Sequence, residues 1–341
     1  MPAMPNGGAL NRLRLFKDYL LRKPVCSAKP VEISIETTTK CNLRCPMCTR
    51  EQLVPSLTNM DLALFKRIID QGQKYLELVV PMNLGEPLMN PQIYEIIRYC
   101  KNKDMNVLIS TNGTLLNENN SRKLLESGVD YLIFSFDGAS KEIYERYRAG
   151  ADFGQVRANL LSFFKMKREL KSRTHCVIQM VVLKDNQGEI EAFRDMWDAE
   201  DVEIRFKPNL VLGEEFSIPR TLDQNPATLK KPCFHLWRGS FVVRVDGIVF
   251  PCCWSYNTLP VGDLKTQSLD EVWNSPEMLA LRKKHAAGTA DQIPTCRNCS
   301  LIQPEVTSLA AAFLLTGPQV RRLLPVREKI VAFFEKLRPQ K

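Results

Sequence analysis

The sequence lacks the features that would place it in a membrane or outside the cell. Its 341 residues contain no uninterrupted apolar stretch long enough to cross a bilayer, and the N-terminus lacks the apolar core of a secretory signal. No glycine-rich or proline-rich tract indicates a long disordered region. These absences predict a folded protein that resides in the cytoplasm.

Histidine is scarce, and this scarcity argues against several kinds of hydrolase. The three histidines, His175, His235 and His285, are isolated in the sequence. We find neither a nucleophile elbow nor a His-x3-His pair. The sequence therefore gives no reason to predict hydrolase chemistry, and the histidines are assigned no role.

Net charge is missing from the middle of the chain, although the whole chain has a formal charge of +9. Residues 1–30 carry six Lys/Arg and one Asp, and residues 305–341 carry seven Lys/Arg and three Glu, so the ends contribute +5 and +4. Residues 31–304 are then formally neutral. A neutral body predicts no nucleic-acid partner.

Both charged ends have the pattern of basic amphipathic helices. One helical face is apolar in each, and its residues are Leu10, Leu13, Phe16 and Leu20 near the start and Val326, Ile330, Phe334 and Leu337 near the end. Such helices can dock on an anionic lipid surface or an acidic partner, or pack on the protein body with their lysines outward. Peripheral membrane contact is therefore one hypothesis for these extensions.

From residue 31 onward, short β-rich runs alternate with amphipathic helical stretches, which predicts an α/β fold of repeated βα units on a parallel sheet. Several runs are almost entirely apolar, as expected for strands covered on both faces. The six predicted strands are residues 31–38, 76–83, 106–112, 131–137, 176–183 and 202–208. Chemistry is expected at their carboxyl ends.

The cysteines are numerous and grouped. With no signal peptide, the grouping of eleven cysteines favours metal ligation in a reducing compartment over disulfides. Cys41, Cys45 and Cys48 form a C-x3-C-x2-C pattern directly after the first predicted strand. A 4Fe-4S cube normally takes four thiolates, so three leave one iron open to another ligand. A zinc site and buried free cysteines are the alternatives.

This loop after a first strand resembles the radical S-adenosylmethionine (SAM) superfamily, over residues 31–212. The resemblance implies a partial (β/α)6, TIM-like barrel in which the amino and carboxylate groups of SAM chelate the open iron. An electron, delivered by a donor such as flavodoxin or ferredoxin, would cleave SAM to a 5'-deoxyadenosyl radical that abstracts hydrogen from substrate. Met47 would pack near the adenine or shield the cluster.

Polar motifs at the following strand ends support the resemblance. Residues 83–88, NLGEPL, look like the family's GGEP motif, with Leu84 in place of the first glycine. STNG at 110–113 and SFDG at 135–138 end the next two strands, although each alone is also a common turn. The resemblance implies that SAM is contacted by Gly85, Glu86, Pro87, Ser110, Asn112, Ser135, Asp137 and Arg148. For Arg148, a solvated helix charge is the alternative.

A second cysteine set follows the predicted barrel. Cys233, Cys252, Cys296 and Cys299 supply four ligands, enough to saturate a second cluster. Residues 213–304 resemble a SPASM or shorter Twitch module, a small cysteine-rich α+β unit, here with one auxiliary 4Fe-4S cluster. A structural zinc would satisfy the same ligands. Cys253 either replaces Cys252 as ligand or donates a hydrogen atom to a substrate radical.

The remaining features of the sequence are structural. Cys26, Cys100 and Cys176 have no partner at metal-binding spacing, and we interpret them as small buried hydrophobes. Asp246-Gly247 lies between two short apolar runs and predicts a hairpin turn. The segments 1–30 and 305–341 are treated as extensions of the two central units.

Three hypotheses for function follow from these residues. The first is a radical SAM oxidoreductase that oxidises a small polar metabolite, such as an alcohol or amine, with the auxiliary cluster accepting an electron. The second keeps the radical chemistry but crosslinks or epimerises a ribosomal peptide. The third is a non-enzymatic metal-binding interaction module. No motif identifies the substrate.

Overall fold

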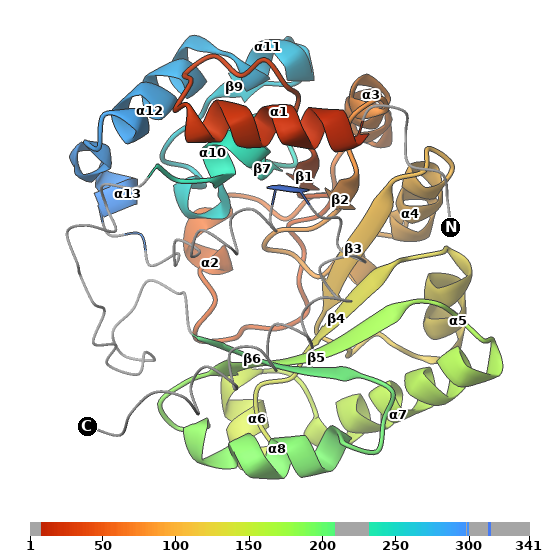
Figure 1. Ribbon diagram of the computed structural model, residues 1–341. Helices are drawn as coiled ribbons and strands as arrows, with labels where there is room; N and C mark the ends of the chain where they lie inside the picture. The colour runs from red at the N-terminus through yellow and green to blue at the C-terminus, as the bar shows by residue number, and fades with distance from the viewer. Residues whose placement is uncertain (1–7, 209–231, 298, 300–312, 315–341) are drawn as a thin grey trace, which may run out of the picture.

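One sheet of nine strands runs through the residues that the computed structural model describes, which are 8–208, 232–297, 299 and 313–314. The strand order is β6-β5-β4-β3-β2-β1-β7-β8-β9. Helices cover the outer side of the curved β1 to β6 part, as Figure 1 shows. The sheet therefore forms an open, partial barrel, with β6 at one edge.

The barrel half consists of six parallel strands, as the sequence predicted. They are β1 (Glu32–Ile35), β2 (Leu78–Val80), β3 (Asn106–Thr111), β4 (Tyr131–Ser135), β5 (His175–Val182) and β6 (Glu203–Pro208). The helices in this half are α2 (Arg50–Leu53), α3 (Leu62–Gly72), α4 (Ile93–Lys101), α5 (Glu118–Glu126), α6 (Lys141–Tyr147), α7 (Phe153–Glu169) and α8 (Ile190–Trp197), with short 3-10 turns η1 (Pro87–Met89) and η2 (Gln187–Glu189). The predicted partial (β/α)6 barrel is confirmed.

Local sequence explains where these elements begin and which side they bury. The Asp61 side chain accepts a hydrogen bond from the backbone N–H of Leu64 at 2.8 Å and so begins α3. In β3, Val107 and Ile109 are fully buried, while the residues between them are only partly covered. Because successive side chains of a strand point to opposite sides, this alternation shows that one side of β3 faces the core. The three lone cysteines, Cys26, Cys100 and Cys176, are all buried in that core, as expected.

The cysteine-rich module continues the barrel sheet. Its strand β7 (Phe241–Val243) pairs in parallel with β1, and β8 (Ile248–Phe250) and β9 (Gly262–Asp263) follow antiparallel. The predicted turn lies between β7 and β8, where Gly247 has φ +89°, a conformation that favours glycine. The helical elements of the module are α10 (His235–Arg238), η4 (Cys253–Ser255), α11 (Leu269–Trp273), α12 (Pro276–Ala286), η5 (Ala290–Gln292) and α13 (Pro294–Arg297).

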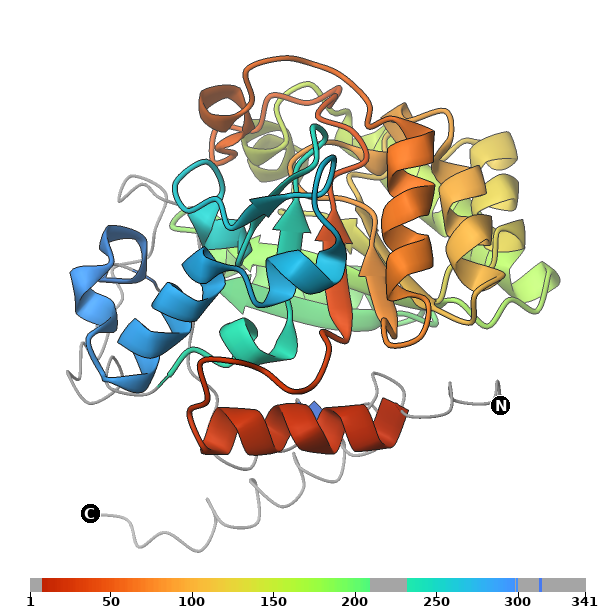
Figure 2. The ribbon, with the colours of Figure 1, turned by 90° about the horizontal axis from the view of Figure 1, so that it is seen from above.

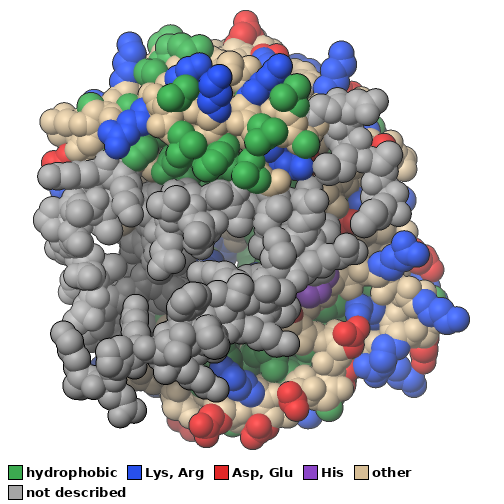
Figure 3. Space-filling view, viewed as in Figure 1, with side chains coloured by type: hydrophobic (Ala, Val, Ile, Leu, Met, Phe, Trp, Pro, Cys, Tyr) green, Lys and Arg blue, Asp and Glu red, His purple; other side chains and the backbone are tan. Residues whose placement is uncertain are grey.

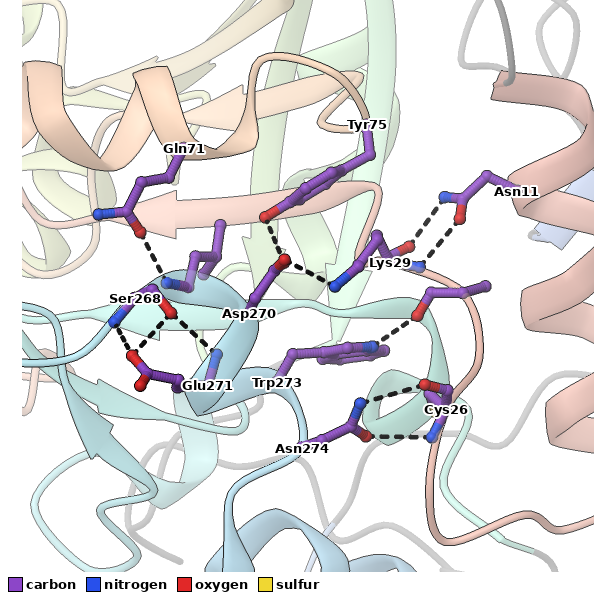
Figure 4. Close-up of polar contacts among 12 residues, drawn as sticks. Asn11, Cys26, Lys29, Gln71, Tyr75, Ser268, Asp270, Glu271, Trp273 and Asn274 are labelled. Atoms are coloured by element: carbon purple, nitrogen blue, oxygen red, sulfur yellow. Dashed lines mark hydrogen bonds and ion pairs between the residues drawn. The ribbon is translucent and has the colours of Figure 1, made fainter.

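Polar contacts fasten α11 to the barrel and to the segment that precedes β1 (Figure 4). Asp270 accepts a hydrogen bond from the Tyr75 hydroxyl at 3.0 Å and forms an ion pair with Lys29 at 2.7 Å. The indole N–H of Trp273 donates to the Ala28 carbonyl at 2.7 Å. Because these contacts join residues almost 200 or more positions apart, module and barrel are packed as one unit.

Helix α1 (Gly8–Leu20) lies across the amino-terminal end of the sheet (Figure 2). It is attached through buried Leu15 and Tyr19 and through an ion pair between Arg12 and Glu77 at 2.5 Å. The apolar face predicted from the sequence is mostly on the other side: Leu10, Leu13 and Leu20 are between 53% and 58% exposed. Helix α1 therefore packs on the body with Lys17 outward, as one alternative held, but it does so through Leu15 and Tyr19 and not through the predicted apolar face.

The second amphipathic segment, around residues 326–337, lies outside the described residues, and its predicted face is not described. Just before it, Phe313 is buried and its ring lies 5.2 Å from that of Tyr19 and 5.6 Å from that of Phe16. Phe313 thus lies beside α1. No described helix is both long and apolar enough to span a bilayer.

Candidate active site

The loop with the first three cysteines leaves the carboxyl end of β1 and is held by its own threonines. The backbone of Thr39 pairs with that of Thr58, and the Thr39 hydroxyl donates to the Ser56 carbonyl at 2.8 Å. Within the loop, Cys41 and Cys45 are half-buried and Cys48 is exposed. Burial raises the pKa of the Cys41 and Cys45 thiols. A bound metal would favour the thiolates by its positive charge.

A cavity of about 260 Å3 opens where this loop meets the carboxyl ends of the neighbouring strands. It is lined by Cys41, Cys45 and Cys48 together with seven of the nine residues predicted to contact SAM, namely Met47, Gly85, Glu86, Ser110, Asn112, Ser135 and Arg148. Pro87 and Asp137 do not line it. The structure thus brings together residues that are spread over more than 100 positions of the sequence.

Gly85 lies so close to the cysteine loop that a side chain would not fit. A Cβ atom at this position would be 2.2 Å from the Thr38 carbonyl oxygen and 2.9 Å from that of Lys40. The next residue, Glu86, donates its backbone N–H to the Lys40 carbonyl at 2.8 Å. Glycine is therefore required here for the close approach of two backbones, and the turn and the loop are fixed against each other.

The carboxylate of Glu86 supports the end of β3. It accepts hydrogen bonds from the Thr111 hydroxyl and from the backbone N–H of Asn112, both at 2.7 Å, and from the N–H of Leu88 at 3.2 Å. Burial raises the pKa of Glu86, and these hydrogen bonds oppose the rise. Because the Glu86 carboxylate already accepts three hydrogen bonds, it stabilises the protein around the end of β3. Contact of Glu86 with SAM stays a prediction. Pro87 begins the short turn η1.

The polar residues at the ends of β3 and β4 connect the strands to the loop. The Asn112 side-chain amide donates to the Asn42 side-chain oxygen at 3.0 Å, which links β3 to the cysteine loop. The hydroxyls of Ser110 and Ser135 lie 3.2 Å apart, one from each strand. These groups offer donors and acceptors toward the cavity.

Arg148 and Asp137 form a buried ion pair beside the cysteine loop. The guanidinium Nη2 lies 2.5 Å from the Asp137 carboxylate, and Nη1 lies 4.0 Å from the Cys45 sulfur. Burial alone would lower the pKa of Arg148, but Asp137 and Cys45 outweigh it and hold the pKa above its usual value. The Arg148 side chain is only 14% exposed, so the solvated-charge alternative was wrong. Asp137 faces Arg148 and the backbone N–H of Val181.

One buried donor of Arg148 is left over. Its Nε has no hydrogen-bond partner among the described residues. An unsatisfied buried donor at the wall of a cavity costs stability unless a ligand supplies an acceptor. Met47 is packed on Tyr147 and Leu183 beside Cys45, which is compatible with either role predicted for it.

The second cysteine set gathers in the C-terminal module. Burial is the largest cause that raises the pKa of Cys233 to about 12, and the charges of Cys252, Cys299 and Cys296 add to it. Such mutual influence requires the four thiols to be near one another. In the described part of the chain, no three His, Cys, Asp or Glu side chains converge enough to hold one metal ion. In a 4Fe-4S cube each thiolate binds a different iron, so its four ligands need not converge on one ion. Ligation of a cluster by these cysteines stays a prediction.

Cys253 is oriented differently from its neighbour. The side chain is exposed, yet it is surrounded by enough protein that partial desolvation raises the pKa of its thiol to about 11. The charge of Cys252 adds to this rise, and the charge of Lys207 on β6 opposes it. The charge of Cys252 raises the pKa of both Cys233 and Cys296, whereas Cys253 is coupled to Cys252 and Cys299 but not to those two thiols. This favours Cys252 as the fourth member of the set.

Sequence reasoning missed a contact that joins the loops of the two cysteine sets. Glu36, directly after β1, is fully buried and accepts a hydrogen bond from the Tyr256 hydroxyl at 2.7 Å. It also accepts from the backbone N–H of Leu84 at 3.3 Å. Burial raises the pKa of Glu36. No local pattern indicates a contact between two residues that are 220 positions apart. The one sequence feature that could have pointed to it is an acidic residue, Glu36, at the end of a predicted strand.

Comparison with known families decides what this arrangement is. Residues 35–196 match the model of the radical SAM superfamily, and residues 233–300 match SPASM, an iron-sulfur cluster-binding domain. The chain belongs to the radical SAM superfamily. This radical SAM enzyme uses a 4Fe-4S cluster and SAM, and its SPASM domain carries additional iron-sulfur binding. Three thiols and an unpartnered Arg148 donor at one cavity fit these groups.

Known relatives share most of the length of this radical SAM chain. The tungsten-containing aldehyde ferredoxin oxidoreductase cofactor-modifying protein of Pyrococcus furiosus is 26% identical over 78% of this chain and 86% of its own. The crystal structure of BtrN in complex with AdoMet and 2-DOIA superposes with a TM-score of 0.53 at 20% identity, over 80% of this chain and 94% of BtrN. Native anSMEcpe with AdoMet and the Cp18Cys peptide gives 0.59 at 16%, over 88% and 99%. These two structures show the fold alone.

Proposed function

We propose that this radical SAM enzyme oxidises a small polar metabolite, most simply by dehydrogenating an alcohol or an amine. The observation that carries the proposal is the cavity of about 260 Å3, which the three-cysteine loop shares with hydroxyl and amide groups at the ends of β2, β3 and β4 and with the Arg148 guanidinium at the end of α6. A cavity of this size, with mostly apolar walls and a few polar groups, suits a small molecule better than a folded partner.

The residues around the cavity have distinct tasks in this proposal. The Arg148 guanidinium, already held by Asp137, offers its free Nε to a carboxylate. The Ser110 and Ser135 hydroxyls, 3.2 Å apart, offer hydrogen bonds to a polyhydroxylated ligand. Met47 is 7% exposed and excludes water beside Cys45. When bound, SAM and its cluster supply a radical that takes one hydrogen atom from the substrate.

The proposed oxidation removes two electrons and two protons in total. One hydrogen atom leaves with the adenosyl group, one further electron passes to the auxiliary cluster of the SPASM domain, and one proton passes to water. The electron that starts the reaction comes from a donor such as flavodoxin or ferredoxin. Two similar proteins support a small-molecule substrate: BtrN is bound to 2-DOIA, and the Pyrococcus protein is a cofactor-modifying protein.

A peptide substrate is the second candidate, and one observation favours it. Native anSMEcpe, which is bound to the Cp18Cys peptide, is matched over 99% of its length by this chain. A peptide can therefore be held by an enzyme of this size without a separate recognition domain. In this case the exposed thiol of Cys253 would donate a hydrogen atom to the substrate radical.

The test is anaerobic reconstitution followed by measurement of 5'-deoxyadenosine from SAM under reduction. Replacing Cys41, Cys45 and Cys48 with Ala should abolish formation of 5'-deoxyadenosine, while Cys176→Ala, at a buried core position, should retain it. Substrate pools then separate the candidates: polyols and amines should yield products that are two hydrogens lighter. If only peptides are altered, the small-molecule proposal is wrong and the second candidate holds.

A further inference from the structure

The exposed aliphatic side chains of this protein are concentrated at one place. Seven large hydrophobic residues are exposed in the described part of the chain, and five of them fall between residues 10 and 25. They are Leu10, Leu13, Leu20, Leu21 and Val25, each between 53% and 58% exposed. Apolar patches of this kind on a protein surface mark a site of interaction.

The outward face of α1 combines these leucines with positive charge. Leu10, Leu13, Arg14, Lys17, Leu20 and Leu21 follow one another at helical spacing, and all are exposed; we call them the α1 face. The only acidic residue between 8 and 25 is Asp18, which is 1% exposed and accepts hydrogen bonds from Ser27. Figure 3 shows hydrophobic and basic side chains side by side over this helix. The α1 face is therefore apolar and uniformly positive.

The helix does not need this face in order to fold. Leu15 and Tyr19 are buried on its inner side, and Arg12 is paired there with Glu77. Buried Phe313 packs against Phe16 and Tyr19 at the flank of α1. Phe313 therefore covers only the flank of α1, and the α1 face stays exposed.

The α1 face is on the opposite side of the barrel from the cysteine loop. Helix α1 contacts Glu77, which precedes β2, so it lies at the amino-terminal ends of the strands. The cysteine loop follows the carboxyl end of β1, and Figure 2 shows α1 and this loop at opposite sides of the molecule. A surface bound at α1 would leave the active-site cavity open to water.

We propose that the α1 face docks the protein on an anionic lipid bilayer. A helix lying in the membrane interface buries its leucines among the acyl chains and places its lysine and arginine side chains at the anionic headgroups. The occupant is a bilayer and not a second copy, because two α1 faces would bring like charges together. Docking attaches the enzyme at the membrane while its substrate still enters from the aqueous side.

Vesicle flotation with the full-length, anaerobically reconstituted protein tests this proposal. The protein should float with vesicles that contain phosphatidylglycerol, and it should stay at the bottom with vesicles of phosphatidylcholine alone. Arg14→Ser with Lys17→Ser should lower the partition coefficient about thirty-fold. Leu13→Glu with Leu20→Glu should lower it by at least roughly tenfold, because the leucines no longer insert.

Matched controls change exposed residues elsewhere in the protein. Arg157→Ser with Lys165→Ser removes two exposed charges from α7, and Leu170→Glu alters a leucine that is 40% exposed at the end of α7. These controls should float as the unmodified protein does. All variants should form 5'-deoxyadenosine normally, since α1 and α7 side chains changed here do not line the cavity.

Three results would overturn the proposal. The first is absence of flotation with anionic vesicles, and the second is flotation that the α1 variants leave unchanged. The third is sedimentation of the protein as a dimer that the Leu13→Glu, Leu20→Glu variant dissociates, without flotation, which would assign the α1 face to a second copy. None of these results bears on SAM cleavage, so the proposed reaction is tested separately.

Discussion

Replacing Gly85 with Ala should uncouple the strand-end turn from the cysteine loop. The added Cβ would be placed 2.2 Å from the Thr38 carbonyl oxygen, about 1 Å closer than van der Waals contact permits. Both neighbours are backbone atoms, so neither can rotate away. The turn must shift by about 1 Å, which costs roughly 1–3 kcal/mol and stretches the 2.8 Å hydrogen bond from Glu86 to Lys40. A misplacement of this size lowers a rate by about a hundredfold.

The assay compares the rate of 5'-deoxyadenosine formation and the iron content of Gly85→Ala with those of the unmodified protein. Gly188→Ala is the matched control, because a Cβ at that position meets nothing within 4 Å. We expect Gly85→Ala to keep most of its iron while losing about a hundredfold in rate. A Gly85→Ala protein with the rate of Gly188→Ala would show that the contact between turn and loop does not position the reacting groups.

Three further predictions test the buried polar groups and the second cysteine set. Asp137→Asn should lower the free energy of unfolding by about 3–5 kcal/mol in urea titrations, because a buried guanidinium loses its counter-charge. Cys252→Ala should remove the iron of the auxiliary cluster while Cys253→Ala retains it, as measured by iron per chain; the reverse result would exchange their roles. Burial raises the pKa of Glu36 above 4.5, so its protonated form is favoured by folding and stability should fall as pH rises above about 4.5. Glu36→Gln should flatten this fall, and Tyr256→Phe should extend it to higher pH, because it removes a donor that favours the ionised carboxylate.

The sequence predicted the parts of the protein whose signals are local. Short β-rich runs, several of them almost entirely apolar, identified all six barrel strands, and a C-x3-C-x2-C pattern after the first strand located the three-cysteine loop. A strand end followed by Gly-Glu-Pro, such as Gly85-Glu86-Pro87, can be recognised in the same way. Each of these signals spans fewer than ten residues, so no knowledge of the fold is needed to read it.

Features that depend on tertiary contacts were not predictable. Contact of Asp137 with SAM stays a prediction, and no local pattern showed that its carboxylate faces Arg148, whose position depends on where α6 ends. The orientation of α1 was equally hidden, because the helix has apolar residues on two sides. The ion pair between Arg12 and Glu77 and the burial of Tyr19 determine which side faces inward. Such choices are made by tertiary contacts and not by periodicity.

The contact between Glu36 and Tyr256 gives a physical reason for a buried carboxylate that would otherwise be a disadvantage. A fully buried carboxylate destabilises a fold unless its hydrogen bonds are satisfied, and an apolar residue of similar size would be less costly. Glu36 binds the turn after β2 through Leu84 and the module through Tyr256. Glu36 is only a few residues before Cys41, and Tyr256 is only a few residues after Cys252. Directional hydrogen bonds fix relative position more narrowly than apolar packing does. The proposed oxidation, in which an electron would pass from the radical site to a second cluster, would need that fixed separation.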